Sequence, residues 1–304
     1  MTPQKTLSGR AWIELSLLSL LWGGSFLSIR IALDEIGFFT AVAHRVFWAT
    51  LVLWAAVAIL RLPLPRDPKI WAAFLIMGLL NNVIPFSLMA WGQLHIESGL
   101  TSILNGATAI FGVVVAAIVF RDERLTARRV IGVTLGFFGV TIAIGLENLR
   151  SLDLRSLAQL AVLGGTISYA LAASWARVTL SGLPPQVAAA GMLTGSSVIM
   201  LPVAFITEGT PSFALQADTI ISIAYFAIAA TAFAYLLYYR VLAMAGSGNL
   251  MLCTLIIPPI AILLGAVVLG ESLLPQAFFG FAVLALGLLI LDGRIVRVFT
   301  RPAE

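Results

Sequence analysis

Two stretches of the chain place polar and aromatic side chains at helical spacing within otherwise apolar sequence. The first stretch consists of Asn82, Phe86, Met89 and Gln93. The second stretch, 149 residues later, consists of Thr231, Tyr235 and Tyr238. Because the members of each set are three or four residues apart, each set shares one face of a helix. Amide, hydroxyl and aromatic groups on such faces can hold a small polar molecule through hydrogen bonds and ring contacts.

Two further stretches repeat this pattern with smaller side chains. One consists of Thr101, Asn105 and Thr108, and its counterpart consists of Leu250, Thr254 and Ile257. Polar groups in apolar helices are costly unless they face a cavity or a neighbouring helix. For any one residue, a hydrogen bond between helices is as good an explanation as a binding site. The pairing of the stripes favours a shared internal cavity.

Pro85 and Pro258 interrupt two of these stretches. A proline removes one backbone donor and frees a carbonyl group in the preceding turn. The freed carbonyl can line a wet cavity, or the helix can flex at that point. We therefore interpret Pro85 and Pro258 as hinges, with fixed kinks as the alternative.

His44 and Arg45 are candidates for function, because both lie within an apolar run near its outer end. Arg45 could hold a substrate carboxylate, or it could pair with Asp34 or Glu35. The internal salt bridge is the favoured interpretation.

Three glutamates lie at the boundaries of apolar runs. Glu14 falls near the start of the first run, and Glu123 and Glu271 each precede a later run. A carboxylate at such a place can cap the following helix and interact with its positive N-terminal end. Capping is therefore predicted for these glutamates, in preference to proton coupling or catalysis.

The composition of the chain indicates which solvent surrounds it. The chain is 60% hydrophobic and 11% charged, and its mean hydropathy is +1.03. Soluble domains carry about 25% charged residues, so this chain belongs in lipid. The pI near 9.6 does not indicate nucleic acid, because the basic residues fall in short loops and form no patch. The lone Cys253 lies in an apolar run, so neither a disulfide nor a Cys-based metal site is available. We expect no bound metal and no cofactor.

Ten apolar runs of about 20 residues each are long enough to cross a bilayer as helices. Strands are excluded because the runs lack the alternation of a barrel strand, and lipid offers no partner to unpaired backbone groups. The predicted spans are 11–33, 39–60, 70–93, 98–120, 127–146, 157–179, 186–207, 218–242, 248–269 and 275–293. The predicted fold class is therefore an all-α membrane protein with ten transmembrane helices.

The loops between these spans differ in charge on the two sides of the membrane. One side holds Lys5, Arg10, Arg61, Arg66, Lys69, Arg121, Arg124, Arg128, Arg129, Arg294, Arg297 and Arg301. The other side holds Asp34, Glu35, Glu97, Glu208, Asp218 and Glu271, with Arg150 and Arg155 as basic exceptions. The positive-inside rule places both termini in the cytoplasm.

The chain also repeats itself by halves. Glu123, Leu125, Gly132 and Gly139 recur, at a constant offset of 148 residues, as Glu271, Leu273, Gly280 and Gly287. A repeat of this kind is typical of a transporter built around a pseudo-two-fold axis, although it could be an evolutionary scar in a static protein. Because each half contains five spans, the second half (149–304) should be inverted relative to the first (1–148). We expect the four glycines to pack the fifth span against the tenth.

These features resemble the ten-span EamA branch of the drug/metabolite transporter superfamily. The resemblance covers nearly the whole chain and rests on LWGGSF at 21–26, His44-Arg45, Pro258 and the two glutamate–glycine repeats. It implies a central cavity lined by spans 1, 3, 4, 6, 8 and 9, with spans 5 and 10 at the periphery. It also implies export of amino acids, metabolites or drugs across bacterial inner membranes, with aromatic amino acid exporters as the closest likeness. Span 4 has Ala109 where the family often has a second proline, which puts a symmetric proline hinge in doubt.

The stripes and the resemblance give one set of candidate substrate-binding residues: Trp22, Ser25, Asn82, Phe86, Asn105, Tyr169, Tyr235, Tyr238 and Thr254. The middle of each span lacks Asp and Glu, which argues against a site for multivalent cations. Aromatic walls with amides and hydroxyls suit a zwitterion or an amphipathic neutral molecule.

The sequence therefore predicts a secondary or facilitated transporter that exports amino acids, aromatic ones included, and related metabolites by alternating access. It contains no Walker-type loop, and coupling to a proton gradient or to nothing stays open. Export of lipophilic drugs or cations on the same fold is the alternative. An integral membrane enzyme is a remote alternative, because His44 and His95 are the only histidines and no nucleophile elbow occurs. We expect a monomer in the bacterial inner membrane, with a small-molecule substrate and no nucleic-acid partner.

Overall fold

The computed structural model describes residues 8–121, 126–145, 153–212, 214–250 and 252–292, and all regular structure in these ranges is helical. The first half contains α1 (Gly9–Ala32), α2 (Phe38–Ile59), α3 (Pro68–Gly78), the π-helix η1 (Leu79–Val83), α4 (Ile84–Gly92), α5 (Ser98–Asn105), α6 (Thr108–Val119) and α7 (Ala127–Ile144). The second half contains α9 (Leu154–Thr179), α10 (Pro185–Glu208), α11 (Ala217–Ala224), the π-helix η2 (Tyr225–Phe233), α12 (Ala234–Leu250), α13 (Cys253–Leu269) and α14 (Pro275–Asp292). Glu123, for which capping was predicted, lies outside the described residues.

Ten apolar helical segments confirm the predicted fold class. By length and composition, eight helices within the described ranges can cross a membrane, and the shorter apolar helices Cys253–Leu269 and Pro275–Leu291 complete the set. The eighth segment extends further than predicted, and α13 begins at Cys253 rather than at 248. Gly246 separates the two with a φ of 79° and a ψ of 167°. Glycine adopts a positive φ at little steric cost, which explains why the helix breaks there.

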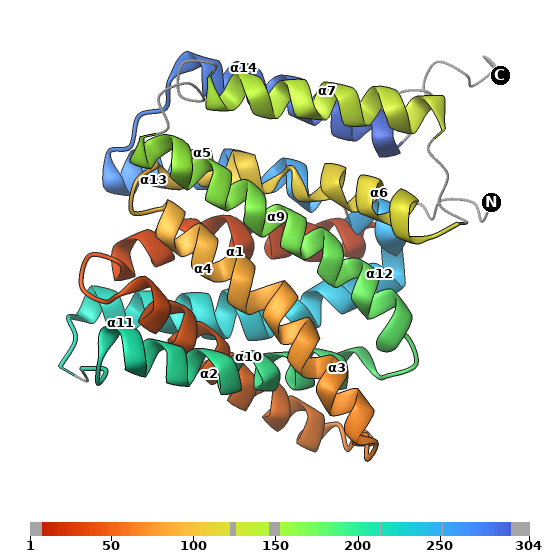
Figure 1. The fold of residues 1–304 in the computed structure, drawn as a ribbon, viewed down its shortest axis with the longest axis vertical. Helices are drawn as coiled ribbons and strands as arrows, with labels where there is room; N and C mark the ends of the chain where they lie inside the picture. The colour runs from red at the N-terminus through yellow and green to blue at the C-terminus, as the bar shows by residue number, and fades with distance from the viewer. Residues whose placement is uncertain (1–7, 122–125, 146–152, 213, 251, 293–304) are drawn as a thin grey trace.

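The two halves run in opposite directions and are interleaved. α1 and α9, the first helices of the two halves, cross the molecule in opposite senses (Figure 1). Helix pairs such as α2 with α10, α1 with α13 and α4 with α9 pack one half against the other. The chain therefore forms a single bundle whose interior belongs to both halves.

α7 and α14 form a separate pair along one edge of the bundle (Figure 1). Glycines let their backbones approach closely: a methyl group added at Gly132 would lie 2.8 Å from the carbonyl oxygen of Gly287. A methyl group at Gly139 would overlap with the backbone of Leu284, and one at Gly280 would overlap with that of Ala143. The predicted packing role of the repeated glycines is therefore confirmed.

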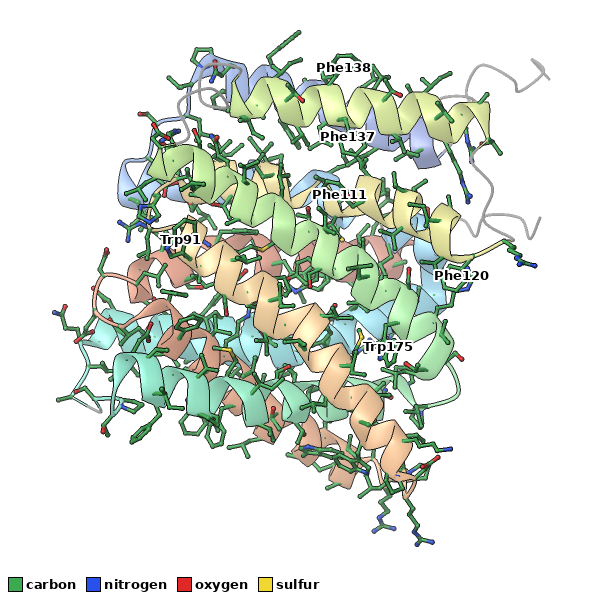
Figure 2. All side chains as sticks on the ribbon, viewed as in Figure 1. Trp91, Phe111, Phe120, Phe137, Phe138 and Trp175 are labelled. Atoms are coloured by element: carbon green, nitrogen blue, oxygen red, sulfur yellow. The ribbon has the colours of Figure 1, made fainter. Side chains whose placement is uncertain are left out.

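Some aromatic side chains connect the α7–α14 pair to the rest of the bundle, and others face away from the bundle. Phe111 of α6 and Phe137 of α7 turn toward each other, with ring centroids 5.3 Å apart (Figure 2). Phe138, the next residue of α7, points away from the bundle and is 59% exposed. A large exposed apolar side chain of this kind suits a surface covered by lipid.

Carboxylates from the second half hold the N-terminal ends of helices in the first half. At the start of α2, the oxygens of Glu208 accept the backbone N–H groups of Phe39 and Thr40 at 3.0 and 2.7 Å. At the start of α5, Glu271 accepts the backbone N–H of Ser98 at 3.0 Å and its hydroxyl at 2.7 Å. A helix N-terminus has unsatisfied N–H groups and a partial positive charge, and a carboxylate compensates both.

A third carboxylate acts in the reverse direction, from the first half to the second. Glu35 accepts the backbone N–H of Gln216, immediately before α11, at 3.1 Å. We call the end of the bundle that holds Glu35, Glu97, Glu208 and Glu271 the capped end.

Glu271 was predicted to cap the helix that follows it, α14, and this prediction was wrong. Its carboxylate instead caps α5, a helix of the other half.

Glu14 does not cap α1, contrary to the prediction. The N-cap of α1 is Ser8, whose hydroxyl accepts the backbone N–H of Ala11 at 3.2 Å. Glu14 lies one turn further along, is buried, and accepts hydrogen bonds from Arg10 at 3.1 Å and Arg240 at 2.5 Å. A buried carboxylate needs such charged partners. The Glu14–Arg240 ion pair therefore joins α1 to α12 at the end opposite to the capped end.

π-helical turns interrupt the third and eighth segments at related positions. η1 lies in the middle of the third segment and η2 in the middle of the eighth. Pro85 lies two residues after the end of η1, in the first turn of α4, and the wider turn accommodates a residue that lacks a backbone N–H. Pro258 has a different setting, because α13 runs unbroken through it from Cys253 to Leu269.

Replacing Gly139 with Ala should destabilise the α7–α14 pair, because the added methyl group would overlap with the backbone of Leu284. Overpacking of this kind costs about 1–3 kcal/mol. Gly112→Ala is the matched control, because nothing lies within 4 Å of a methyl group added there. The midpoint of thermal unfolding in detergent measures both variants, and equal midpoints would contradict the glycine packing.

Glu208→Ala should lower the free energy of unfolding by about 1–2 kcal/mol, because two N–H groups of α2 lose their acceptor. The neighbouring Thr207→Ala is the control, since that exposed hydroxyl bonds only to Val203 of its own helix. Denaturant titration followed by tryptophan fluorescence compares the two. A loss no larger than that of the control would show that the cap contributes nothing.

Candidate functional site

Arg45 lies in the interior of the bundle, where α2 passes between η2 and α4. Its side chain is 8% exposed. Its Nε donates a hydrogen bond to the hydroxyl of Thr231 at 2.9 Å. Its guanidinium carbon lies 3.9 Å from the centroid of the Phe86 ring, in a cation–π contact. Arg45 is therefore held by one hydroxyl and one aromatic face.

The salt bridge favoured for Arg45 is absent, so this prediction was wrong. Asp34 pairs instead with Arg30, one turn earlier on α1, at 2.6 Å. Both oxygens of Glu35 accept the backbone N–H of Gln216. Both carboxylates lie beyond the start of α2, at the capped end, whereas Arg45 lies two turns inside the helix. In the part of the chain that the structure describes, no carboxylate pairs with Arg45.

A chain of hydrogen bonds runs from η1 to α12 and α10 beside Arg45. Asn81 donates to the hydroxyl of Tyr235 at 3.0 Å, and this hydroxyl donates to Oδ1 of Asn82 at 3.3 Å. The amide of Asn82, which is fully buried, donates to the hydroxyl of Ser196 at 2.8 Å. The predicted stripe residues Asn82 and Tyr235 are thus brought together across the two halves.

The two π-helices shape this network. In η2, the hydroxyl of Thr231 donates to the carbonyl of Phe226, five residues earlier, at 2.7 Å. In η1, the carbonyl of Leu80 accepts the hydroxyl of Ser168 from α9 at 2.6 Å. A π-turn leaves carbonyl groups outside the regular ladder, and in an apolar interior side chains must satisfy them. The hydroxyls therefore stabilise the wide turns that carry Asn82 and Thr231.

Aromatic rings complete the surroundings of Arg45. The ring of Tyr169 from α9 lies edge-on to Phe86, with centroids 6.4 Å apart. Tyr169 and Tyr235 both lie in the neighbourhood of Arg45. We call this group the central site, and it consists of Arg45, Asn82, Phe86, Tyr169, Thr231 and Tyr235.

Trp22 and Tyr238 form a second aromatic group beside the central site. Their ring centroids are 5.9 Å apart, and they pack on the apolar cluster formed by α1, α12 and α13. Tyr238 lies three residues after Tyr235 on α12, so the two groups adjoin along that helix. Ser25 does not join them through its hydroxyl, which donates to the carbonyl of Trp22 in its own helix at 2.7 Å.

Asn105 and Thr254 lie elsewhere, where α5 crosses α13. Asn105 ends α5 and accepts a hydrogen bond from Thr108 at 3.4 Å. The carbonyl of Thr254 lies 4.0 Å from the position of a methyl group added at Gly106. His44 also stays outside the central site, since its Nδ1 accepts a hydrogen bond from Trp48 of its own helix at 3.2 Å.

Asn81, Thr231 and Ser196 contribute contacts to the site that the sequence analysis did not predict. Asn81 adjoins Asn82, and two consecutive asparagines in an apolar run are a usable signal. Thr231 belongs to the predicted stripe, and its contact with Arg45 is visible only in the structure. Ser196 follows a glycine in a run of small residues, which is common in membrane helices and gave no signal.

Comparisons with known proteins agree with this architecture. The sequence matches the EamA-like transporter family twice, over residues 10–145 and 156–291. It is 25% identical over 285 residues to an uncharacterized transporter of Archaeoglobus fulgidus, covering 92% of this chain and 98% of that one. It is 27% identical over 295 residues to a probable terminal-alkyne amino-acid exporter of Streptantibioticus cattleyicolor, covering 95% of each chain.

A solved crystal structure shares the fold, with a TM-score of 0.67 at 15% identity over 94% of this chain and 98% of the other. The two family matches cover both halves of the chain and most of its length. The protein is thus a multi-pass integral membrane transporter rather than an enzyme, and it belongs to the EamA-like transporter family.

Proposed function

We propose that the protein exports amino acids, aromatic ones included, and related small metabolites by alternating access, with Arg45 binding the substrate carboxylate. One observation carries this proposal: the guanidinium of Arg45 is buried and has no carboxylate partner among the described residues. A buried charge without a counter-ion is costly. An arginine also presents a planar fork that matches a carboxylate. A substrate carboxylate would supply the missing counter-ion.

The rest of the central site suits the other parts of an amino acid. Phe86 holds Arg45, and the ring of Tyr169 beside it offers stacking to a substrate ring and cation–π contact to its ammonium group. The side-chain oxygens of Asn82 and Tyr235 can accept hydrogen bonds from the ammonium. These acceptors are uncharged, so they bind the ammonium weakly enough for the substrate to dissociate again.

The inverted halves support alternating access. The central site takes Arg45, Asn82 and Phe86 from residues 1–148 and Tyr169, Thr231 and Tyr235 from residues 149–304. A rocking motion of one repeat against the other would therefore open the site from either end. The printed name of the relative from Streptantibioticus cattleyicolor, an amino-acid exporter, agrees with the substrate class proposed here.

Export of lipophilic drugs or cations is the rival function. A cationic drug would meet the positive charge of Arg45 in a site whose six residues include no carboxylate. Expression in a sensitive host separates the two functions. We expect resistance to toxic amino-acid analogues, whereas the rival function gives resistance to cationic dyes.

Arg45→Ala should lower the kcat/KM for amino-acid flux by about 10- to 100-fold, because hydrogen bonds to charged groups contribute about 1.5–3 kcal/mol. Arg45→Lys should fall between this variant and the wild type, since lysine keeps the charge and loses the fork. Counterflow in proteoliposomes with a panel of radiolabelled amino acids measures the rates. Arg66→Ala, in an exposed loop, is the control. Wild-type flux in Arg45→Ala would contradict the proposal.

We also propose that the protein is a monomer in the bacterial inner membrane with both termini in the cytoplasm. The native cysteine, Cys253, is buried, so a Cys253→Ala background suits labelling with a membrane-impermeant maleimide. Ser212→Cys lies at the capped end and Lys69→Cys at the opposite end, and both positions are exposed. In intact cells Ser212→Cys should react and Lys69→Cys should not. The reverse pattern would invert the proposed orientation.

A further inference from the structure

Two buried glutamines lie between the central site and the capped end. Gln93, immediately after α4, is 1% exposed, and Gln159, on α9, is fully buried. Neither the Oε1 nor the Nε2 of either side chain has a hydrogen-bond partner among the described residues. Buried amides are expensive to leave unpaired, so each such amide in a native protein needs an explanation.

The packing of α4 on α9 places both glutamines in one stretch of this interface. A methyl group at Gly92, which adjoins Gln93, would lie 3.4 Å from the carbonyl of Ala158, which adjoins Gln159. Arg155 lies one turn before Gln159 on the same face of α9. Its guanidinium binds Glu97 through both oxygens, at 2.9 and 3.2 Å. The two amides therefore lie beneath an ion pair that joins the two halves.

The two glutamines lie near both the central site and the cavity at the capped end. Gln93 and Phe86 share one face of the α4 segment, and seven residues of helix separate them by roughly 10 Å. At the capped end, a cavity of about 260 Å³ is lined by Gln93, Glu97, Arg30, His95 and Glu271, among others. The stripe predicted from the sequence thus runs from the central site to an opening at the capped end.

We propose that Gln93 and Gln159 form a second substrate site, a transit site for zwitterionic amino acids between the central site and the capped end. This inference rests on the proposed function. An amide oxygen accepts a hydrogen bond from an ammonium group, and an amide N–H donates to a carboxylate. Two neutral amides can therefore bind both ends of a zwitterion and still release it.

The ion pair between Glu97 and Arg155 also favours a zwitterion over a cation. Glu97 and Arg155 lie on the capped-end side of the amides, and a substrate that inserts between them leaves each charge without its partner. A zwitterion supplies a replacement for both, since its ammonium can pair with Glu97 and its carboxylate with Arg155. A lipophilic cation replaces only one partner and is repelled by Arg155. The transit site therefore selects for zwitterions.

The test compares stability with flux in Gln93→Leu, Gln159→Leu and the double variant. Removing unpaired buried amides should leave the midpoint of thermal unfolding unchanged or raise it. Flux of radiolabelled amino acids in proteoliposomes should nevertheless fall at least ten-fold in the double variant. The dissociation constant of the Arg45-dependent component of equilibrium binding, which reports on the central site, should change less than two-fold. Gln276→Leu, on the peripheral α14, is the control.

Double-variant flux within two-fold of wild type would overturn the inference and leave the amides as structural groups, whatever the midpoint. If the leucine variants do not fold, Gln93→Met and Gln159→Met keep an unbranched side chain and answer the same question. The two proposals fail separately. Absence of amino-acid flux in the wild type removes the proposed function, whereas normal flux in the glutamine variants together with a defective Arg45→Ala removes only the transit site.

Discussion

The structure depends on a requirement that every helix start imposes. The first N–H groups of a helix have no partner within the helix and must find one outside it. Here carboxylates of one half supply the partners for the other: Glu208 for α2, Glu271 for α5 and Glu35 for the entry to α11. At the opposite end, the Glu14–Arg240 ion pair also joins the two halves.

The caps also position the central site. Glu208 holds Thr40 at the start of α2, and Arg45 follows five residues later, so the register of the cap decides where the guanidinium meets Thr231 and Phe86. Each feature of the site is costly by itself. A buried arginine that has no carboxylate partner among the described residues, and two π-turns, are arrangements that an apolar bundle would not adopt for packing alone. Such features are typical of sites at which a ligand or a motion contributes the compensating interaction.

The sequence predicted the fold well and the contacts of individual side chains unevenly. Long apolar runs and the repeated glycines depend on properties of single segments, so ten helices and the α7–α14 packing could be predicted. The helical spacing of Asn82 and Tyr235 likewise predicted a shared interior face. The partners of Arg45, Glu14 and Glu271 could not be predicted, because each lies on a distant segment whose approach depends on tertiary packing. The π-turns were missed for a similar reason: the hydroxyl of Ser168 that satisfies η1 comes from another helix.

The exchange of caps between the halves has a consequence for biosynthesis. Residues 9–119 leave the ribosome and enter the bilayer before Glu208 and Glu271 have been translated. During that interval the starts of α2 and α5 must rely on water and lipid headgroups at the membrane surface. Final docking of these helices has to wait for the last third of the polypeptide, which makes the nascent first half dependent on the insertion machinery or on a slow, late rearrangement. A ribosome-stalled chain of the first half should accordingly be a preferred client of membrane chaperones and quality-control proteases.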